Sequence, residues 1–456
     1  MTDLRTPPAP DPVNPGRTGL DAPAEVFRKR RERFLDAIGD GVALLPASPE
    51  LFRSGDSEHR YRPDSDLHYL TGFPEAEAVA LLTPHDPEHR LTLFVRPRDP
   101  EKEAWTGARA GVEGARERFG ADAAYPIGEL GERLEELLRT ADRVLYALGV
   151  DRSLDGKVID LLQSFRRSRA RSGEGPTGIE DPGTVLHPMR RIKDDFELMR
   201  MRQAAEISAA AHRAAMSALA PGRGEWEIEA LLEMEFRARG GSGPAFAPIV
   251  GAGARGTVLH YVDNDGVIGP DDLVLIDAGA ELGMYAADIT RTTPAGGRFT
   301  AEQRAVYEVV LAAEEAAIGA VKPGAGADDP HQAALRVLVE GMVDLGLLEG
   351  PAGDRIEDRE YRKFFMHRTS HWLGMDVHDV GGYVEDGAPV ILRPGMVLTV
   401  EPGLYISPHL EGVPERLRGI GVRIEDDVEV TGDGHRVTTR GVPVDPEEIE
   451  ALVGRD

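Results

Sequence analysis

The chain has 456 residues, no cysteine, and 79 acidic against 53 basic side chains, which gives a net charge of −26. Its length predicts two or three domains. The negative charge argues against nucleic acid and anionic membranes as partners, because both attract Lys and Arg. Without cysteine, disulfides, thiolate zinc sites and cysteine nucleophiles are excluded, so any metal must be held by histidines and carboxylates.

The first 24 residues contain six prolines and no apolar run of the kind that a signal peptide needs. We expect residues 1–24 to be a flexible extension. No later stretch reaches the roughly 18 uninterrupted apolar residues of a membrane-spanning helix. The expected location is therefore cytoplasmic.

From Glu25 onward, predicted strands alternate with predicted helices, which is typical of an α/β domain. The stretch 167–185, rich in Arg, Gly, Pro and Ser, predicts a loop or hinge. We expect an N-terminal α/β domain over residues 25–185 and a second domain over residues 186–456. The individual elements are helices at 26–38 and 129–141 and strands at 41–47, 78–84, 91–97 and 143–149.

The second half of the chain carries a weak internal repeat. A long helix is predicted from about 194 to 220, and it stops at Pro221-Gly222. A second helical stretch is broken in the same way at Pro323-Gly324, and each break is followed by another helix and by strands. Two such units indicate a duplicated α+β domain with a site between its halves.

Two aspartates flank a predicted turn after a buried strand. Asp277 follows the apolar run 273–276, and the chain returns to Asp288 after eleven positions. A hairpin would bring both carboxylates within reach of a common point. Turn and capping roles remain the alternative for this segment.

Three histidines lie within twelve positions, namely His367, His371 and His378. The spacing of His367 and His371 suits a zinc pair on a helix, but the glutamate of an HExxH motif is missing and the neighbouring glycines favour strands and turns. A buried structural histidine is the alternative interpretation of each one.

Two apolar, β-branched runs are each interrupted by a glutamate, Glu401 within 396–406 and Glu425 within 419–431. A buried strand seldom carries glutamate unless the charge is paired or bound to metal. A salt bridge between Glu425 and Arg423 is the alternative.

Together these segments offer four carboxylates and one imidazole: Asp277, Asp288, His371, Glu401 and Glu425. A set dominated by oxygen suits two divalent cations, with Mn²⁺ favoured and Co²⁺ or Zn²⁺ as alternatives. Two such ions would activate water and stabilise a tetrahedral intermediate.

The ordered motifs LIDAG…DITRT, MHRTSHWLGMDVHDVG, VLTVEPGLY and GVRIEDD resemble the pita-bread metallopeptidases, and most closely the Xaa-Pro aminopeptidases. The segments TVLHYVDN and RSGDSEHRYRPDSDLHYLTGF extend the resemblance over nearly the whole chain. It implies an α/β N-terminal domain followed by an α+β pita-bread catalytic domain with pseudo-twofold symmetry. It also implies a substrate, namely peptides with proline at the second position, cleaved before that proline.

Residue roles also follow from the matching motifs. Asp277 would bind one metal ion, and His371 and Glu401 the other. Asp288 and Glu425 would bridge the two ions. Glu401 would in addition handle the proton of the attacking water.

The resemblance implies five further residues at the site. His260 and His378 would lie beside the substrate, bind the scissile peptide and stabilise the oxyanion. His367, Arg423 and Tyr405 would shape the pocket or support the metal ligands.

In this family the first domain helps to build a tetramer and covers the neighbouring active site, so we expect a homodimer or homotetramer. Asp56 and Trp105 match positions where relatives place an acid for the substrate amine and an aromatic lid. Core packing is the alternative for Trp105. Arg368-Thr369 departs from the Gly-Leu of some members, which leaves the pocket shape open.

Two other functions remain open. An Xaa-Pro dipeptidase (prolidase) uses the same scaffold, and DVHDVGGY resembles both enzymes. A dipeptidase must also recognise the substrate's terminal carboxylate with a basic group. A non-catalytic pita-bread binding module is the alternative from another class. The glycine spacing of 251–256 suits a dinucleotide site, but no amphipathic helix follows it.

Overall fold

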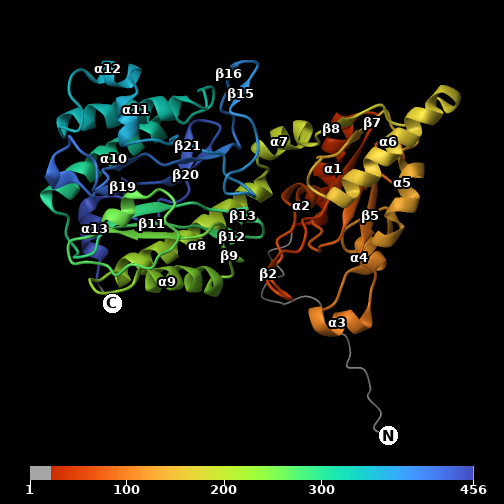
Figure 1. Cartoon of the computed structure of the whole chain (residues 1–456), viewed down its shortest axis with the longest axis horizontal. Helices are drawn as coiled ribbons and strands as arrows, with labels where there is room; N and C mark the ends of the chain where they lie inside the picture. The colour runs from red at the N-terminus through yellow and green to blue at the C-terminus, as the bar shows by residue number, and fades with distance from the viewer. Residues whose placement is uncertain (1–21, 455–456) are drawn as a thin grey trace, which may run out of the picture. The chain divides into compact units, whose positions relative to one another are not determined.

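The computed structural model describes residues 22–454, and the chain divides into two compact units, Met1–Pro188 and Met189–Asp456 (Figure 1). Nearly all of the expected extension, residues 1–24, lies outside the described residues. Among the helices that the structure describes, none is both long and apolar enough to cross a bilayer.

The first unit is built on one mixed sheet with the strand order β6-β5-β4-β1-β7-β8. Its strands are β1 (Gly41–Pro46), β4 (Val79–Leu82), β5 (Leu91–Val95), β6 (Ala123–Pro126), β7 (Arg143–Leu145) and β8 (Ile179–Glu180), beside a separate hairpin of β2 (Phe52–Ser54) and β3 (Ser57–Glu58). Its helices are α1 (Ala24–Ile38), α2 (Ser65–Thr71), α3 (Pro100–Thr106), α4 (Gly111–Glu117), α5 (Leu130–Leu138) and α6 (Arg152–Ser172). Leucines of α5 pack against the apolar side chains of the sheet in one buried cluster.

Both helices and all four strands that the sequence predicted for this unit are present, whereas the loop predicted at 167–185 is confirmed only in its middle, at residues 173–178. Helix α6 continues to Ser172, where Gly173 ends it in a left-handed conformation with φ +74°. Arginine is a good helix former, so the Arg-rich stretch is the solvated side of this helix. Strand β8 then extends the sheet, and α7 (Gly183–Arg191) follows.

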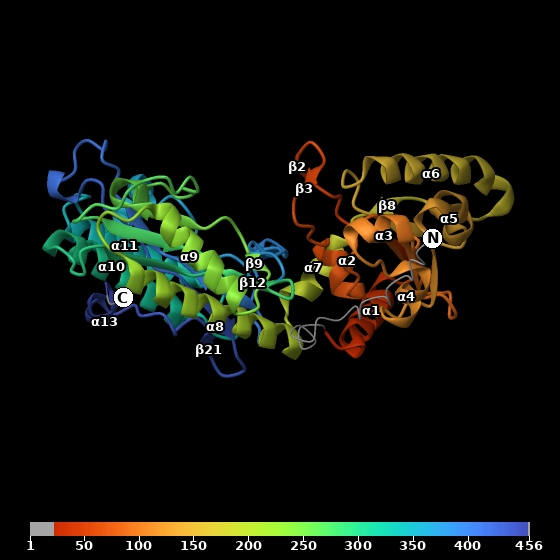
Figure 2. The same ribbon diagram turned by 90° about the horizontal axis from the view of Figure 1, so that it is seen from below.

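The second unit contains two helix pairs, and both views show the members of each pair side by side (Figures 1 and 2). They are α8 (Asp195–Ala218) with α9 (Glu225–Ala238), and α10 (Ala301–Ala320) with α11 (Asp329–Asp344). Helices α8 and α10 both begin with a reciprocal capping box, which satisfies amides that the first turn leaves unpaired. Two short helices complete the unit, α12 (Ala352–Glu357) and α13 (Pro446–Leu452).

The predicted duplication is confirmed by matching details of the two halves. The Pro-Gly break of each half places a glycine at positive φ, +90° for Gly222 and +86° for Gly324. Just beyond each break, a glycine forms an isolated antiparallel bridge to a later segment of its own half. These bridges join Gly224 to Val267 and Gly326 to Ile391.

The strands of the second unit form small sheets with the orders β10-β11-β14, β13-β12-β9, β17-β20-β21, β18-β19 and β15-β16. In the first half they are β9 (Gly243–Pro244), β10 (Ile249–Ala252), β11 (Leu273–Asp277), β12 (Ala280–Leu282), β13 (Tyr285–Ala286) and β14 (Thr290–Pro294). In the second half they are β15 (Val384–Glu385), β16 (Ala388–Pro389), β17 (Val397–Val400), β18 (Gly403–Tyr405), β19 (Gly421–Arg423), β20 (Asp426–Val430) and β21 (His435–Val437).

The hairpin expected between Asp277 and Asp288 is more elaborate than a single turn. Strands β11 and β14 do pair, with Asp277 opposite Thr290, but β12 and β13 form a hairpin of their own between them. The chain recrosses itself tightly at Gly279, where a Cβ atom would lie 1.6 Å from the carbonyl oxygen of Ala287. Only glycine permits this crossing, which sets Asp277 beside Asp288.

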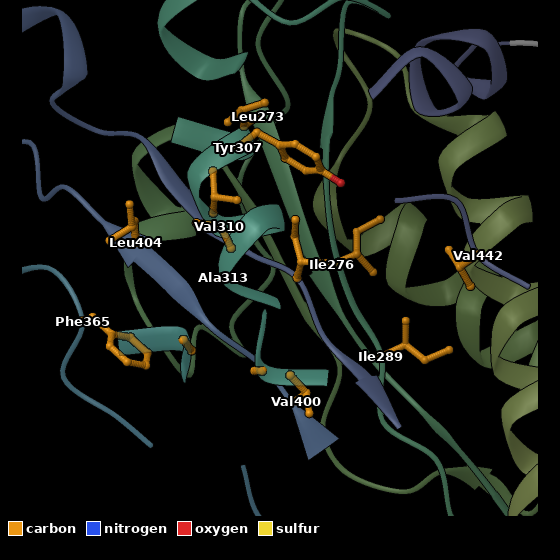
Figure 3. Close-up of a cluster of buried hydrophobic side chains, with 14 of the residues drawn as sticks. Leu273, Ile276, Ile289, Tyr307, Val310, Ala313, Phe365, Val400, Leu404 and Val442 are labelled. Atoms are coloured by element: carbon orange, nitrogen blue, oxygen red, sulfur yellow. The ribbon is translucent and has the colours of Figure 1, made fainter. Parts of the chain in front are cut away.

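Each of the four acids predicted as ligands is next in sequence to a fully buried apolar residue: Ile276, Ile289, Val400 and Ile424. Figure 3 shows Ile276, Ile289 and Val400 in the core, with Tyr307 and Val310 of α10 in the same cluster. Neighbouring residues of extended chain point to opposite faces, so these anchors direct the acids away from the core. Burying each anchor contributes about 1.5–3 kcal/mol, which holds the backbone of the site.

Candidate metal centre

A cavity of about 900 Å³ opens in the second unit, and the acids and histidines singled out in the sequence meet on its wall. Those on the lining are Asp277, Asp288, His371, Glu401, Glu425, His260, His367, His378 and Arg423. The acids and Arg423 lie at or near strand ends of both halves of the repeat, and the histidines lie in the connecting segments. Tyr405 is fully enclosed next to them and contacts two of them.

His371 lies among three of the carboxylates. Its Nε2 atom is 3.5 Å from Asp288 Oδ2, and 3.9 Å from both Glu401 Oε1 and Glu425 Oε1. Its other ring nitrogen, Nδ1, is 3.1 Å from the carbonyl oxygen of Trp372. A carbonyl only accepts, so Nδ1 carries the proton and the lone pair of Nε2 faces the acids.

Two carboxylate oxygens at the centre are buried and have no hydrogen-bond partner among the described residues, Asp277 Oδ1 and Asp288 Oδ1. The other oxygen of Asp277 is paired with the guanidinium of Arg423. An unpaired buried carboxylate oxygen is unfavourable, and a cation supplies the missing partner. The ligand types and these unpaired oxygens therefore fit bound divalent cations.

The pKa values of the acids in the metal-free protein also indicate a cation site. Burial, followed by repulsion from neighbouring carboxylates, raises the pKa values of Asp288 and Glu425 well above their usual range. Burial also raises the pKa of Glu401 to about 7, although His371 and Arg423 lower it in part. Positive charge placed among these groups would favour their ionised forms.

Two histidines lie at the open side of the cavity. The His378 ring stands edge-on to the His371 ring, with 4.5 Å between centroids and 86° between planes. Burial and the nearby His371 and His260 lower the pKa of His378, so its ring is neutral at pH 7 and offers one N–H. His260 is exposed in the segment after β10 and also lines the cavity.

A hydrogen-bonded chain of three further residues adjoins the cavity. His367 Nε2 is 2.8 Å from the Tyr405 hydroxyl, which accepts a hydrogen bond from Arg423 at 3.0 Å. Burial lowers the pKa of His367 to about 4 and raises that of Tyr405 to about 12, so both are neutral at pH 7. His367 Nδ1 also lies 3.6 Å from Glu401 Oε2. The sequence alternative of a salt bridge from Glu425 to Arg423 gives way to the pair with Asp277.

Sequence reasoning missed three residues that hold the centre. Thr290 donates its hydroxyl to Glu425 Oε2 at 2.7 Å, and Asp427 accepts the Asp288 amide at 3.1 Å. The Tyr383 hydroxyl accepts the Trp372 amide at 2.8 Å, and the two rings stack. The run of three acids that starts at Glu425 was the one available signal, since a buried strand rarely carries so many.

Asp56 and Trp105 belong to the first unit, and both are exposed there. Asp56 lies in the turn between β2 and β3, and Trp105 near the end of α3 is 90% exposed. Core packing of Trp105 is therefore wrong. A role for either residue at an active site stays a prediction.

Comparison with known proteins agrees with this fold. Residues 199–432 match metallopeptidase family M24, and residues 27–146 match the N-terminal domain of aminopeptidase P. An Xaa-Pro aminopeptidase of Escherichia coli is 43% identical over 94% of this chain and 97% of its own length. A solved structure of Pseudomonas aeruginosa aminopeptidase PepP has a TM-score of 0.92 and 48% identity, covering 95% of this chain and 98% of that one.

Fold and site thus define a two-domain metallopeptidase with a mixed α/β N-terminal domain and an α+β catalytic domain. The chain belongs to metallopeptidase family M24, with an aminopeptidase P N-terminal domain ahead of the M24 domain. Similar relatives extend to human Xaa-Pro aminopeptidase 3, which is 31% identical over 97% of this chain and 87% of its own length.

Proposed function

We propose that the chain is an Xaa-Pro aminopeptidase, which releases the first residue of peptides that carry proline at the second position. Two divalent cations, most favourably Mn²⁺, would be held by Asp277, Asp288, His371, Glu401 and Glu425. The observation that carries this proposal is the convergence of those five side chains on one wall, with two carboxylate oxygens left unpaired. The names of the curated relatives support the substrate class.

Cations at this wall would supply Lewis acidity and lower the pKa of water. The side chains of the chain itself supply proton handling and orientation. Glu401, which lines the cavity and would be held ionised by the cations, is suited to accept a proton from water and pass it to the proline nitrogen as the peptide bond breaks. His378 and His260 would donate N–H groups to the substrate carbonyl, where negative charge develops.

The remainder of the cavity suits a proline ring. Phe246, Leu259 and Val377 contribute apolar surface to its lining. Proline has no amide hydrogen and a fixed φ, so a substrate with proline at the second position needs shape complementarity more than backbone hydrogen bonds. Complementarity to the ring would select this peptide class.

The prolidase alternative needs a basic group for the terminal carboxylate of a dipeptide. Arg423 is paired with Asp277, and Arg368 at the cavity lining is paired with Asp328. Both arginine side chains on the lining are thus already paired with carboxylates. This favours longer peptides over free dipeptides.

A substrate panel tests the proposal directly. The protein is freed of metal with chelator, supplied with Mn²⁺, and assayed with Ala-Pro, Ala-Pro-Ala and Ala-Ala-Ala at constant pH. We expect cleavage of Ala-Pro-Ala only, and only with metal present. Preference for Ala-Pro would indicate a dipeptidase, full activity without metal would refute the metal mechanism, and tight metal binding with no turnover would indicate the binding module.

The remaining proposals concern organisation. We propose that residues 25–185 are an accessory domain, that residues 186–456 carry the chemistry, and that the protein is a cytoplasmic homodimer or homotetramer. The exposed Trp105 and Asp56 would then serve the active site of a neighbouring copy. Sedimentation of the wild type and of Trp105→Ala, together with KM for Ala-Pro-Ala, tests both points. A monomer with unchanged KM would contradict them.

A further inference from the structure

A buried ion cluster lies next to His378 and belongs to none of the proposed catalytic groups. Asp379, the following residue, accepts hydrogen bonds from Arg190 at 2.6 Å and from Lys193 Nζ at 3.0 Å, one on each carboxylate oxygen. The side chains of Asp379 and Lys193 are each 1% exposed, and that of Arg190 is 3% exposed. Breaking either of these ion pairs would strongly destabilise the protein, because it would leave a buried charge without its partner.

The cluster fixes the loop that carries His378 at several points. Arg190 also binds Asp376 Oδ2 at 2.7 Å, and the Asp379 amide donates to the carbonyl of Trp372 at 2.8 Å. A Cβ atom on Gly374 would lie 2.2 Å from Asp379 Oδ2, so the loop closes directly onto the carboxylate. The backbone on both sides of His378 is therefore tied to charges buried beneath it.

The contrast between the two neighbours is informative. Asp379 is buried, whereas His378 is exposed to the cavity, and residues 373–381 form a loop with neither helix nor strand. Backbone hydrogen bonds tie Leu373 to Val397 at 3.1 Å and Gly374 to Ala286 at 2.8 Å, but His378 lies four residues beyond them, so its exposed ring needs a further restraint close by. Arg190, in the last turn of α7, and Lys193, between α7 and α8, are far from the loop in sequence and supply that restraint.

We propose that Asp379, clamped by Arg190 and Lys193, is a positioning residue that holds His378 at the substrate carbonyl. The inference rests on the proposed peptidase function, in which His378 contacts substrate. Misplacing a catalytic group by about 1 Å costs up to about 10²-fold in rate. Weakening the clamp should therefore lower kcat while metal binding, which uses other side chains, is retained.

The test uses the full chain with Mn²⁺ and the variant Lys193→Met, which removes one cation and leaves the Arg190–Asp379 pair. We expect kcat for Ala-Pro-Ala to fall about ten- to a hundredfold, with KM and bound metal within about twofold of the wild type. In a His378→Ala background the same substitution should change kcat less than about twofold. Lys193→Arg should recover much of the loss.

The matched control is Arg202→Met, because Arg202 binds the buried Glu429 at 2.7 Å outside the cavity. We expect Arg202→Met to lower the melting temperature but to leave kcat for Ala-Pro-Ala unchanged. An equal loss of kcat from Lys193→Met with and without His378, or none at all, would overturn the proposal. Asp379→Asn, if it folds, should behave as Lys193→Met does.

A readout without turnover separates this inference from the peptidase proposal. In protein loaded with diamagnetic Zn²⁺ in place of Mn²⁺ and labelled at histidine Cε1, the His378 resonance is assigned by its absence in His378→Ala. We expect one sharp signal in the wild type and a shifted or broadened one in Lys193→Met, but not in Arg202→Met. An unchanged signal would refute the clamp even if peptides are cleaved, and a changed signal would support it even if they are not.

Discussion

Thr290 and Glu425 are joined twice, through the Thr290 hydroxyl on Glu425 Oε2 at 2.7 Å and through the Glu425 amide on the Thr290 carbonyl at 3.0 Å. The two residues belong to opposite halves of the internal repeat. Asp277 and Asp288 come from the first half, while His371 and the two glutamates come from the second. The proposed metal centre therefore lies at the seam between the halves.

Asp288→Ala should abolish turnover and lower metal content below one ion per chain, because the ligand atoms of Asp288, His371 and Glu425 lie within 4.8 Å of one another and Asp288 would serve both ions. The measurement is elemental analysis beside kcat for Ala-Pro-Ala. Asp344→Ala, on the exposed side of α11, is the control and should change neither. Two ions per chain with near-normal kcat would refute the ligand assignment.

Without metal, stability should depend on pH through Glu401. Burial raises its folded-state pKa from 4.5 to about 7, so the folded state holds the proton more tightly than the unfolded chain. This contribution to stability is complete below pH 4.5 and is lost as the pH rises through 7.

Metal-free Glu401→Gln lacks this titration. Its melting temperature relative to the metal-free wild type should therefore rise between pH 5 and pH 8, by about 5 °C for a difference of about 2 kcal/mol. Thermal melts in chelator at both pH values test this. If the difference in melting temperature between Glu401→Gln and the wild type is the same at both pH values, Glu401 does not have the raised pKa.

His378→Ala should keep its metal and lose about 10²–10³ in kcat, the usual effect of removing one oxyanion donor. Because the ring is exposed at the cavity, the melting temperature should change little. His409→Ala, outside the cavity lining, serves as the control. A large fall in melting temperature with normal kcat would assign His378 to packing instead.

Gly279→Ala should destabilise the protein by more than about 3 kcal/mol, since the new methyl group would overlap the Ala287 carbonyl and force the backbone apart. Metal content should fall with it, because the same crossing places Asp277 beside Asp288. Gly319→Ala is the matched control: it lies on helix α10 with open space around it and should stabilise by up to about 1 kcal/mol. Urea melts of both variants test the contrast.

The ligand acids could be predicted from the sequence because charge inside an apolar, β-branched run is conspicuous, as at Glu401 and Glu425. The role of Asp427 could not be predicted, because it follows two other acids in the same run. Only the register of β20 decides which of these acids faces the metal centre. Thr290 was equally invisible, because its partner lies 135 positions away. The loop expected at 167–185 was placed too early because its Arg-rich start has a composition that loops share with the solvated face of a helix.

The division of the ligands between two halves also has a consequence for the protein during synthesis and folding. Neither half alone presents the full set, so a nascent or clipped chain has no complete centre to load. Ion uptake should follow the docking of both halves, and the metal then stabilises only the completed fold. Peptide hydrolysis would in this way be withheld from immature and damaged copies.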